Sequence, residues 1–437
     1  MVGKCNHTNS CIFSETNIIQ SMKILIFLCG LLLPGACLVS QDSLFNAHVL
    51  DHTYHFDIVD NKFVGPGTEI LNQAYNEHQY VMLGEYHMSP LISKFTAASI
   101  PLLDKAGFEH VAFEVGPYGL EKFLDALKGQ ADIHKALTNF HTQYGYHSSD
   151  GYYETMIPFF DFYEDGDFLK MILDKEWQIY GVDQEYQNGT TMLLDLMFEK
   201  MSQSDQQRLN KMHLMAKDTV SLYNQLAAEI SSYPERGILN SQFLKEYFEE
   251  LSRLPENQKV VGGIMKSMEI YGLAYIHRKW YDSFITRLSH FKQNLNEQMK
   301  LNNFDRTKDK MFIKIGGLHA YKGTSAYECF DLGNTIHELA EMNGSKSLHM
   351  HFSSRYYQEE GEYFDEGTNV NDPLYDLTKL GKKDQWTIID LRPFRAKMLF
   401  YPQQYKVNPR LRREIVSYDF FIITKEDYEG KPYVKGK

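Results

Sequence analysis

The stretch from Tyr80 to Val115 limits the possible fold most strongly, because its pattern is that of a strand, a helix and a second strand. An apolar run ends at Gly84, and Ser89 with Pro90 then begins an amphipathic segment. Serine is a preferred N-cap residue, and proline is a preferred first residue of a helix. A helix between two such strands predicts parallel neighbours joined by a right-handed crossover. The expected elements are strands at 80–83 and 110–115 and a helix at 89–105.

The rest of the chain continues this pattern. Residues 190–305 show helical periodicity almost throughout, and another helix is expected to begin near Asp331. The acidic, glycine-rich stretch 359–372 is expected to be a surface loop. The fold class is therefore α/β, with a mostly parallel central sheet flanked by helices and a large helical insertion or cap at 190–305. We expect one α/β domain over 41–437, with further strands at 177–182, 311–315, 347–352, 386–391 and 418–424.

The N-terminal forty residues have the features of a signal peptide. Met22 and Lys23 precede an apolar run that is short for a membrane span and ends in small residues. Residues 1–21 are polar and without pattern, so translation starts either at Met1 or at Met22. Cleavage near Ser40 predicts an exported protein, periplasmic or secreted. Lipidation of Cys37 is the less favoured alternative, because a proline stands in the stretch before it.

Charge and cysteine content narrow the possible partners. The chain has a formal net charge of −12, and removal of the first forty residues, whose net charge is +1, would make it −13. Binding a phosphate backbone needs clustered lysine and arginine, so nucleic acid is not an expected partner. Cys329 would be the one cysteine of the mature chain, which rules out an internal disulfide. We expect a small-molecule or peptide substrate, and membrane contact only through a signal or lipid anchor.

Polar residues that suit acid–base chemistry follow the predicted strands. Glu85 and His87 come at the end of the first strand, and Glu114 ends the second one. His319 follows the later strand and the turn Gly316-Gly317. In open α/β sheets, ligands bind beyond the carboxyl ends of the strands. A carboxylate beside an imidazole supports either general base chemistry or metal ligation. The structural alternative is a helix-capping glutamate with a surface histidine.

Two further residues are weaker candidates. Asp183 follows the strand at 177–182, and Arg278 lies in the helical region, where an arginine can stabilise a developing oxyanion. The sequence contains no Gly-x-Ser-x-Gly elbow, no P-loop and no His-Glu-x-x-His motif. Ordinary serine hydrolases, P-loop enzymes and zincins are therefore poor fits.

Together these motifs resemble the superfamily of erythromycin esterases, haem-uptake ChaN-like proteins and Tiki proteins. The resemblance rests on Leu83-Gly-Glu-Tyr-His87, Ala112-Phe-Glu-Val-Gly116, Ile179-Tyr-Gly-Val-Asp183, Arg278 and Gly316-Gly-Leu-His319. It implies a parallel α/β core and a pocket that holds both histidines. The esterase branch uses a histidine-activated water, the Tiki branch contains metal-dependent proteases, and the ChaN branch binds haem. The resemblance therefore leaves a divalent metal or haem open as a cofactor.

One departure from the esterase pattern matters. That branch has two residues between the glutamate and the histidine of the first motif, whereas only Tyr86 stands between Glu85 and His87 here. This spacing is closer to ChaN and argues against macrolide hydrolysis. We expect an exported hydrolase of an ester or amide bond, with a water activated by histidine and with glutamate partners. The alternative is a haem- or metal-binding protein without turnover.

Overall fold

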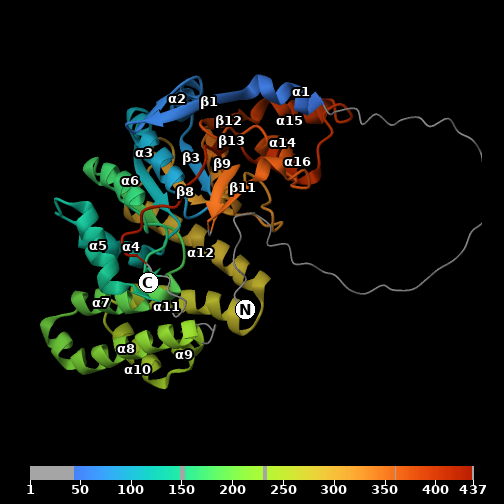
Figure 1. Ribbon diagram of the computed structural model, residues 1–437. Coiled ribbons are helices and arrows are strands. Elements are labelled where there is room, and N and C mark those ends of the chain that lie inside the picture. Colours follow the sequence, from blue (N-terminus) through green and yellow to red (C-terminus); the bar gives the residue numbers. More distant parts are fainter. Residues whose placement is uncertain (1–43, 148–152, 230–233, 360, 436–437) are drawn as a thin grey trace, which may run out of the picture.

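A nine-stranded sheet forms the centre of the computed structural model, which describes residues 44–147, 153–229, 234–359 and 361–435 (Figure 1). The strand order is β2-β1-β12-β13-β9-β3-β8-β4-β7. The six strands from β13 to β7 are parallel, and β12, β1 and β2 continue the sheet in antiparallel pairing. The predicted α/β class with a mostly parallel sheet is confirmed. The bounds are β1 Thr53–Val59, β2 Lys62–Val64, β3 Tyr80–Glu85, β4 Phe108–Phe113, β7 Gln178–Gly181, β8 Lys310–Gly316, β9 Ser347–Ser354, β12 Trp386–Asp390 and β13 Phe420–Thr424.

The order of three central strands corrects one prediction. β3 and β4 are parallel, but they are not neighbours, because β8 lies between them and pairs with both. The helix α3 (Pro90–Lys105) joins them as expected, with the Ser89 hydroxyl accepting from the backbone of Ile92 at 3.4 Å. A strand such as β8, whose side chains are buried along almost its whole length, is most stable in the interior of a sheet. The turn after β8 consequently lies between the ends of β3 and β4.

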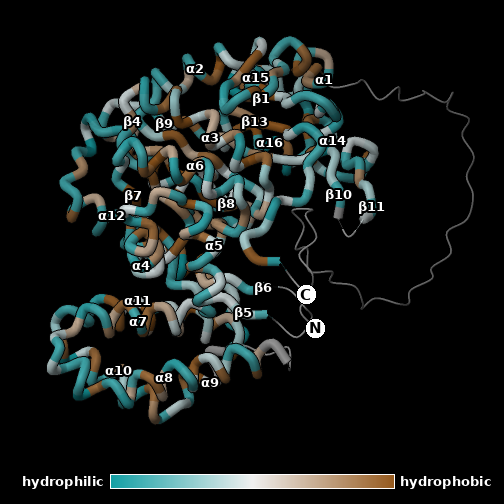
Figure 2. Tube along the Cα trace, turned by 60° about the vertical axis from the view of Figure 1, so that its left-hand side comes forward, coloured by the Kyte–Doolittle hydropathy of each residue, from teal (hydrophilic) through white to brown (hydrophobic). Residues whose placement is uncertain are grey.

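Helices cover both faces of the sheet, and a separate apolar core lies on each side (Figure 2). The larger core packs the sheet against α2, α3 and the helices from α4 to α11. The smaller one packs it against α12, α13, α15 and α16. The helices outside the 190–305 stretch are α1 Leu44–His48, α2 Gly67–Glu77, α4 Pro117–Leu127, α5 Ile133–Tyr144, α6 Tyr163–Asp174, α13 Leu332–Met342, α14 Tyr375–Thr378, α15 Arg392–Phe400 and α16 Pro409–Ser417.

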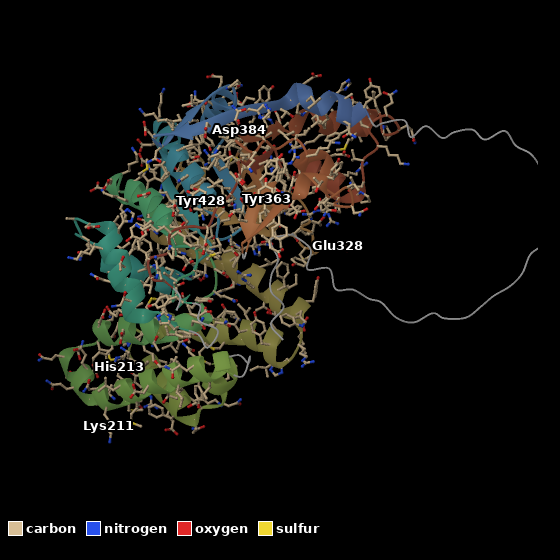
Figure 3. The ribbon with its side chains drawn as sticks, viewed as in Figure 1. Lys211, His213, Glu328, Tyr363, Asp384 and Tyr428 are labelled. Carbon is tan, nitrogen blue, oxygen red and sulfur yellow. The ribbon has the colours of Figure 1, made fainter. Side chains whose placement is uncertain are left out.

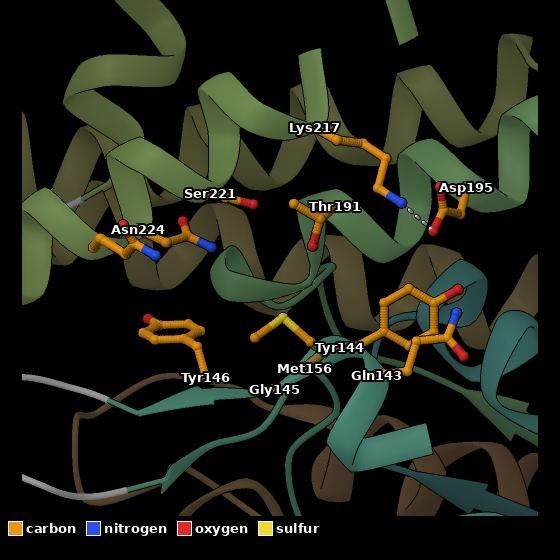
Figure 4. A pocket seen from close by; sticks show the side chains of 11 residues that line it. Gln143, Tyr144, Gly145, Tyr146, Met156, Thr191, Asp195, Lys217, Ser221 and Asn224 are labelled. Carbon is orange, nitrogen blue, oxygen red and sulfur yellow. Dashed lines mark hydrogen bonds and ion pairs between the residues drawn. The ribbon is translucent and has the colours of Figure 1, made fainter. Parts of the chain in front are cut away.

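The stretch expected to be helical folds into a layer of helices beside the sheet, and α12 runs from that layer back to β7 (Figure 1). Its members are α7 Thr190–Lys200, α8 Gln203–Glu229, α9 Pro234–Asn240, α10 Gln242–Ser252, α11 Gln258–Tyr271, the π-helical turn η3 Gly272–Ile276 and α12 Trp280–Leu301. A polar cavity of about 210 Å³ separates the end of α5 from α7 and α8 (Figure 4). An ion pair of 2.8 Å between Lys217 and Asp195 stands at one end of it. This cavity contains none of the residues expected in the site.

Two smaller differences from the sequence analysis concern irregular regions. The predicted loop at 359–372 begins as a hairpin, formed by β10 (Tyr356–Glu359) and β11 (Glu362–Asp365). Tyr357 and Phe364 stack across it at 5.0 Å, an aromatic pairing that the acidic composition concealed. A second short hairpin pairs β5 (Tyr146–His147) with β6 (Tyr153–Glu154).

No helix in the described ranges is long and apolar enough to cross a membrane. The predicted signal peptide at 1–40 lies outside the described residues.

Candidate active site

Three adjacent strands deliver polar residues to one place. Glu85 is the last residue of β3, and Glu114 directly follows β4. His319 closes the short turn after β8, the strand between them. Because the three strands are parallel neighbours, their carboxyl ends meet at one edge of the sheet. The structure therefore brings together Glu85, His87, Glu114 and His319, all expected in the site from the sequence.

His87 is held by the carboxylate two residues before it. Its Nδ1 lies 3.2 Å from Glu85 Oε1, and the other oxygen of Glu85 lies 2.5 Å from the ammonium group of Lys314. Burial would raise the pKa of Glu85, but Lys314 and His87 outweigh it and lower that pKa to about 2. Glu85 is thus ionised and accepts a hydrogen bond from Nδ1 of His87. Nε2 of His87 is therefore the nitrogen that can accept a hydrogen bond.

His319 is oriented in the same manner by a second carboxylate. Its Nδ1 lies 2.8 Å from Asp331, which is also the N-cap of α13. Its ring packs between Phe284 and Phe291 of α12, with centroids 6.0 and 5.0 Å away. Burial would lower the pKa of His319, but Asp331 and Glu114 raise it above its ordinary value. This imidazole therefore keeps its proton to higher pH than a free histidine.

Glu114 connects the two histidines. Its oxygens lie 3.4 Å from Nε2 of His319 and 3.8 Å from Nε2 of His87. It also accepts from the backbone of Gly316 at 2.6 Å and from Arg287 at 3.0 Å. Burial would raise the pKa of Glu114, but the surrounding imidazoles and guanidinium lower it. The 3.8 Å distance is too long for a hydrogen bond, so His87 Nε2 remains available to a water or substrate.

The arginine of the site is Arg287. Its guanidinium makes a bidentate pair with Asp183, at 2.9 and 2.6 Å, and extends to Glu114. Asp183 therefore joins the group through Arg287, as the placement of its strand predicted. Arg278 instead lies exposed in the turn before α12, with a φ of 55°, and forms no hydrogen bond to these carboxylates in the described part of the chain.

Gly316 leaves the space in front of His87 open. A Cβ atom on this residue would lie 2.9 Å from His87 Nε2 and 3.1 Å from Glu114 Oε2. The first distance is shorter than real Cβ contacts allow. A side chain at this position would have to displace the His87 imidazole or the Glu114 carboxylate, which favours glycine here.

His87 is the exposed member of the group. Its side chain is 36% exposed, whereas those of Glu85, Glu114 and His319 are 5, 3 and 6% exposed. Phe159 stacks on its ring with centroids 4.1 Å apart and adopts a φ of 69°, which is unusual for a bulky residue. Such backbone strain gathers at functional sites, where the surrounding structure holds it in place. Substrate would reach the buried groups past His87 and Phe159.

The site suits water better than a divalent metal ion. Within the described residues, no three or more His, Cys, Asp or Glu side chains are arranged to hold a metal. The Arg287 guanidinium already supplies the positive charge beside Glu114 and Asp183. The donor set thus does not fit a divalent metal as it stands.

Three residues of this group were not expected from the sequence. The sequence could have pointed to Arg287, because this charged residue interrupts the apolar helical face that runs from Phe284 to Phe291. It could also have pointed to Lys314, a charged residue within the apolar run of β8. Asp331 was expected only at the start of a helix, and nothing local reveals that it turns toward His319.

Comparison with known proteins gives matches at the level of structure. No protein-family model matches the sequence, and no curated protein matches it. A succinoglycan biosynthesis protein is 12% identical, with 89% of this chain and 98% of that chain covered and a TM-score of 0.51. A mutant of the erythromycin esterase EreC in its open conformation is 12% identical, with 83% and 94% covered and a TM-score of 0.48. Haem-bound ChaN of Campylobacter jejuni is 12% identical, with 72% and 95% covered and a TM-score of 0.29.

Two of these proteins, the erythromycin esterase and ChaN, bear the names of branches of the superfamily that the motifs resemble. At 12% identity the likeness concerns the fold alone. We therefore infer the activity from the geometry of the site.

Proposed function

We propose that this protein is an exported hydrolase of an ester or amide bond in which His87 activates a water molecule. One observation carries the proposal: two imidazoles that are far apart in the sequence face the same buried carboxylate, Glu114, and each has a carboxylate on its Nδ1. Paired titratable groups in different environments are the usual arrangement for acid and base roles. His87 suits the base, and His319, with its raised pKa, suits the acid.

The residues allow a balanced reaction. His87 Nε2 takes a proton from water, and the resulting hydroxide oxygen bonds to the carbonyl carbon. Arg287 and the protonated His319 stabilise the negative charge that develops on the carbonyl oxygen. His319 then gives a proton to the departing oxygen or nitrogen as the bond to carbon breaks. His87 afterwards releases its proton to solvent and His319 takes one up, which restores the starting state. No serine or cysteine in the described ranges is hydrogen-bonded to either imidazole, which favours water as the nucleophile.

The test is turnover of a panel of esters and amides by the purified protein and by His87→Gln. We expect the variant to lose about 10²- to 10⁴-fold in kcat, the usual contribution of a general base. His134→Gln is a matched control, because that side chain is 31% exposed, pairs with Asp167 at 3.0 Å and stacks on Tyr163. Equal activity in the two variants would refute the role of His87. A stoichiometric shift of the haem absorption band on titration would favour the haem-binding alternative instead.

Export is the second part of the proposal, and the signal-like segment Met22–Ser40 supports it. Mass spectrometry of the protein recovered outside the cytoplasm should give a chain that begins near Gln41. A protein that remains inside the cell with Met1 or Met22 at its N-terminus would contradict export. A diacylglyceryl group on Cys37 would identify a lipoprotein.

A further inference from the structure

Large apolar side chains gather on the surface beside His319. We call this group the aromatic patch: Trp280, Tyr281, Phe284, Ile285 and Tyr327. Trp280 and Tyr281 are 51 and 66% exposed, and Tyr327 is 46% exposed. Gathered apolar side chains on a protein surface mark binding sites. The first four lie in the first two turns of α12, where a spacing of three or four residues places them on neighbouring positions of one side.

Phe284 joins the patch to the catalytic group. Its ring lies 6.0 Å from the His319 imidazole at an interplanar angle of 29°, and 4.8 Å from the Tyr327 ring at 65°. Tyr281 of α12 interacts with Cys329, which lies in the same loop as Tyr327. Glu328, labelled in Figure 3, marks this loop beside α12. Aromatic rings thus extend without interruption from His319 to solvent.

The position of the patch determines which half of a substrate it can contact. His319 is the group that protonates the leaving oxygen or nitrogen, whereas His87 lies on the water side. A patch that adjoins His319 therefore faces the alcohol or amine part of the substrate. Its members carry no charge, and four of the five are aromatic. Contacts between rings are worth about 0.5–1.5 kcal/mol beyond buried area, which favours a ring over an alkyl group of equal size.

We propose that the aromatic patch binds an aryl group in the alcohol or amine half of the substrate. This inference rests on the proposed hydrolase function and adds the class of substrate. It identifies Tyr327 and Trp280 as specificity residues that do not touch the reacting atoms.

Hydrolysis of two matched esters tests the inference. 2-Phenylethyl acetate and 2-cyclohexylethyl acetate have the same acyl group and similar leaving alcohols, so their kcat/KM ratio reports recognition of the ring. We expect the phenyl ester to be favoured about two- to tenfold. Tyr327→Leu should bring the ratio toward one. Tyr401→Leu, at a 56% exposed tyrosine after α15, should leave it unchanged. A ratio of one or less in the unmodified protein would overturn the inference.

A binding measurement separates this inference from the proposed function. Of the three tryptophans, Trp177 and Trp386 are 5 and 0% exposed, so a ligand on the surface changes the emission of Trp280. 2-Phenylethanol should change the emission more strongly than 2-cyclohexylethanol, and Trp280→Phe should abolish the change. If no member of the ester and amide panel is hydrolysed but this difference is seen, the hydrolase proposal fails and the aryl site stands. If the acetates are hydrolysed and neither alcohol affects Trp280, the aryl site fails alone.

Discussion

At the scale of single residues, buried carboxylates hold the two histidines to which we assign the base and acid roles. Glu85 is ionised because Lys314 lies 2.5 Å from it, and it fixes the Nδ1 proton of His87. Asp331 raises the pKa of His319 through a 2.8 Å contact. The site therefore depends on two residues, Lys314 and Asp331, that do not face the open side of His87.

Lys314→Met tests the first of these. Without the ammonium group, burial raises the pKa of Glu85, and the low-pH limit of kcat/KM moves to higher pH. Because the pKa of Glu85 is lowered in the folded state, its stabilising effect is complete above the ordinary pKa of 4.5 and is lost as the pH falls toward 2. Leaving one buried charge unpaired costs about 3–5 kcal/mol in the free energy of unfolding at neutral pH, measurable with urea.

The double variant Lys314→Met/Glu85→Gln is the control. It removes both charges and should recover much of the stability, whereas activity should stay low because His87 has lost its carboxylate. A pH profile of Lys314→Met that matches the unmodified protein would contradict this role of Lys314.

Asp331→Asn tests the second residue. Asparagine caps helices as well as aspartate does, so α13 should remain stable. The pKa of His319 should fall, and the alkaline limb of kcat/KM should move to lower pH. The raised pKa of His319 stabilises the fold below about pH 6.5, and this effect is lost as the pH rises through the pKa of the folded state. Asp331→Asn should therefore lose stability mainly at acidic pH. NMR titration of His319 measures the shift, and an unchanged midpoint would refute the assignment.

At the scale of elements, the turn after β8 sets the spacing of the whole site. Gly316 donates its backbone hydrogen to Glu114 and leaves room at His87 Nε2. In Gly316→Ala, the added methyl group displaces His87, and a shift of about 1 Å can cost about a hundredfold in rate. Gly323→Ala in the same loop meets no atom within 4 Å and is the matched control. Steady-state kinetics should separate the two, and equal rates would show that the space at Gly316 is not needed.

The elements also show what a sequence can predict about this chain. Glu85, His87, Glu114 and His319 were found because each follows an apolar run that ends near glycine, and the ends of parallel strands converge. The place of β8 between β3 and β4 was not found, because strand order depends on packing between segments far apart in the chain. Arg287 was missed in favour of Arg278 because a helical pattern does not show which arginine turns toward a carboxylate.

At the scale of the whole molecule, the sheet and the helical layer have separate tasks. The sheet places the carboxylates and imidazoles, while α12 connects the helical layer to the site and contributes Arg287, Phe284 and Phe291. Because α12 packs on β7 and α13, the position of Arg287 depends on the fold of both parts. The central claim is that segments distant in the sequence form a single catalytic unit around Glu114.

A mutant cycle of His87→Gln, His319→Gln and the double variant tests this claim most directly. Residues that act as one unit show strongly non-additive losses. We expect each single variant to lose most of kcat/KM on an ester that the protein hydrolyses, and the double variant to lose little more. Losses that multiply in the double variant, or full activity in either single variant, would show that the two histidines do not work together.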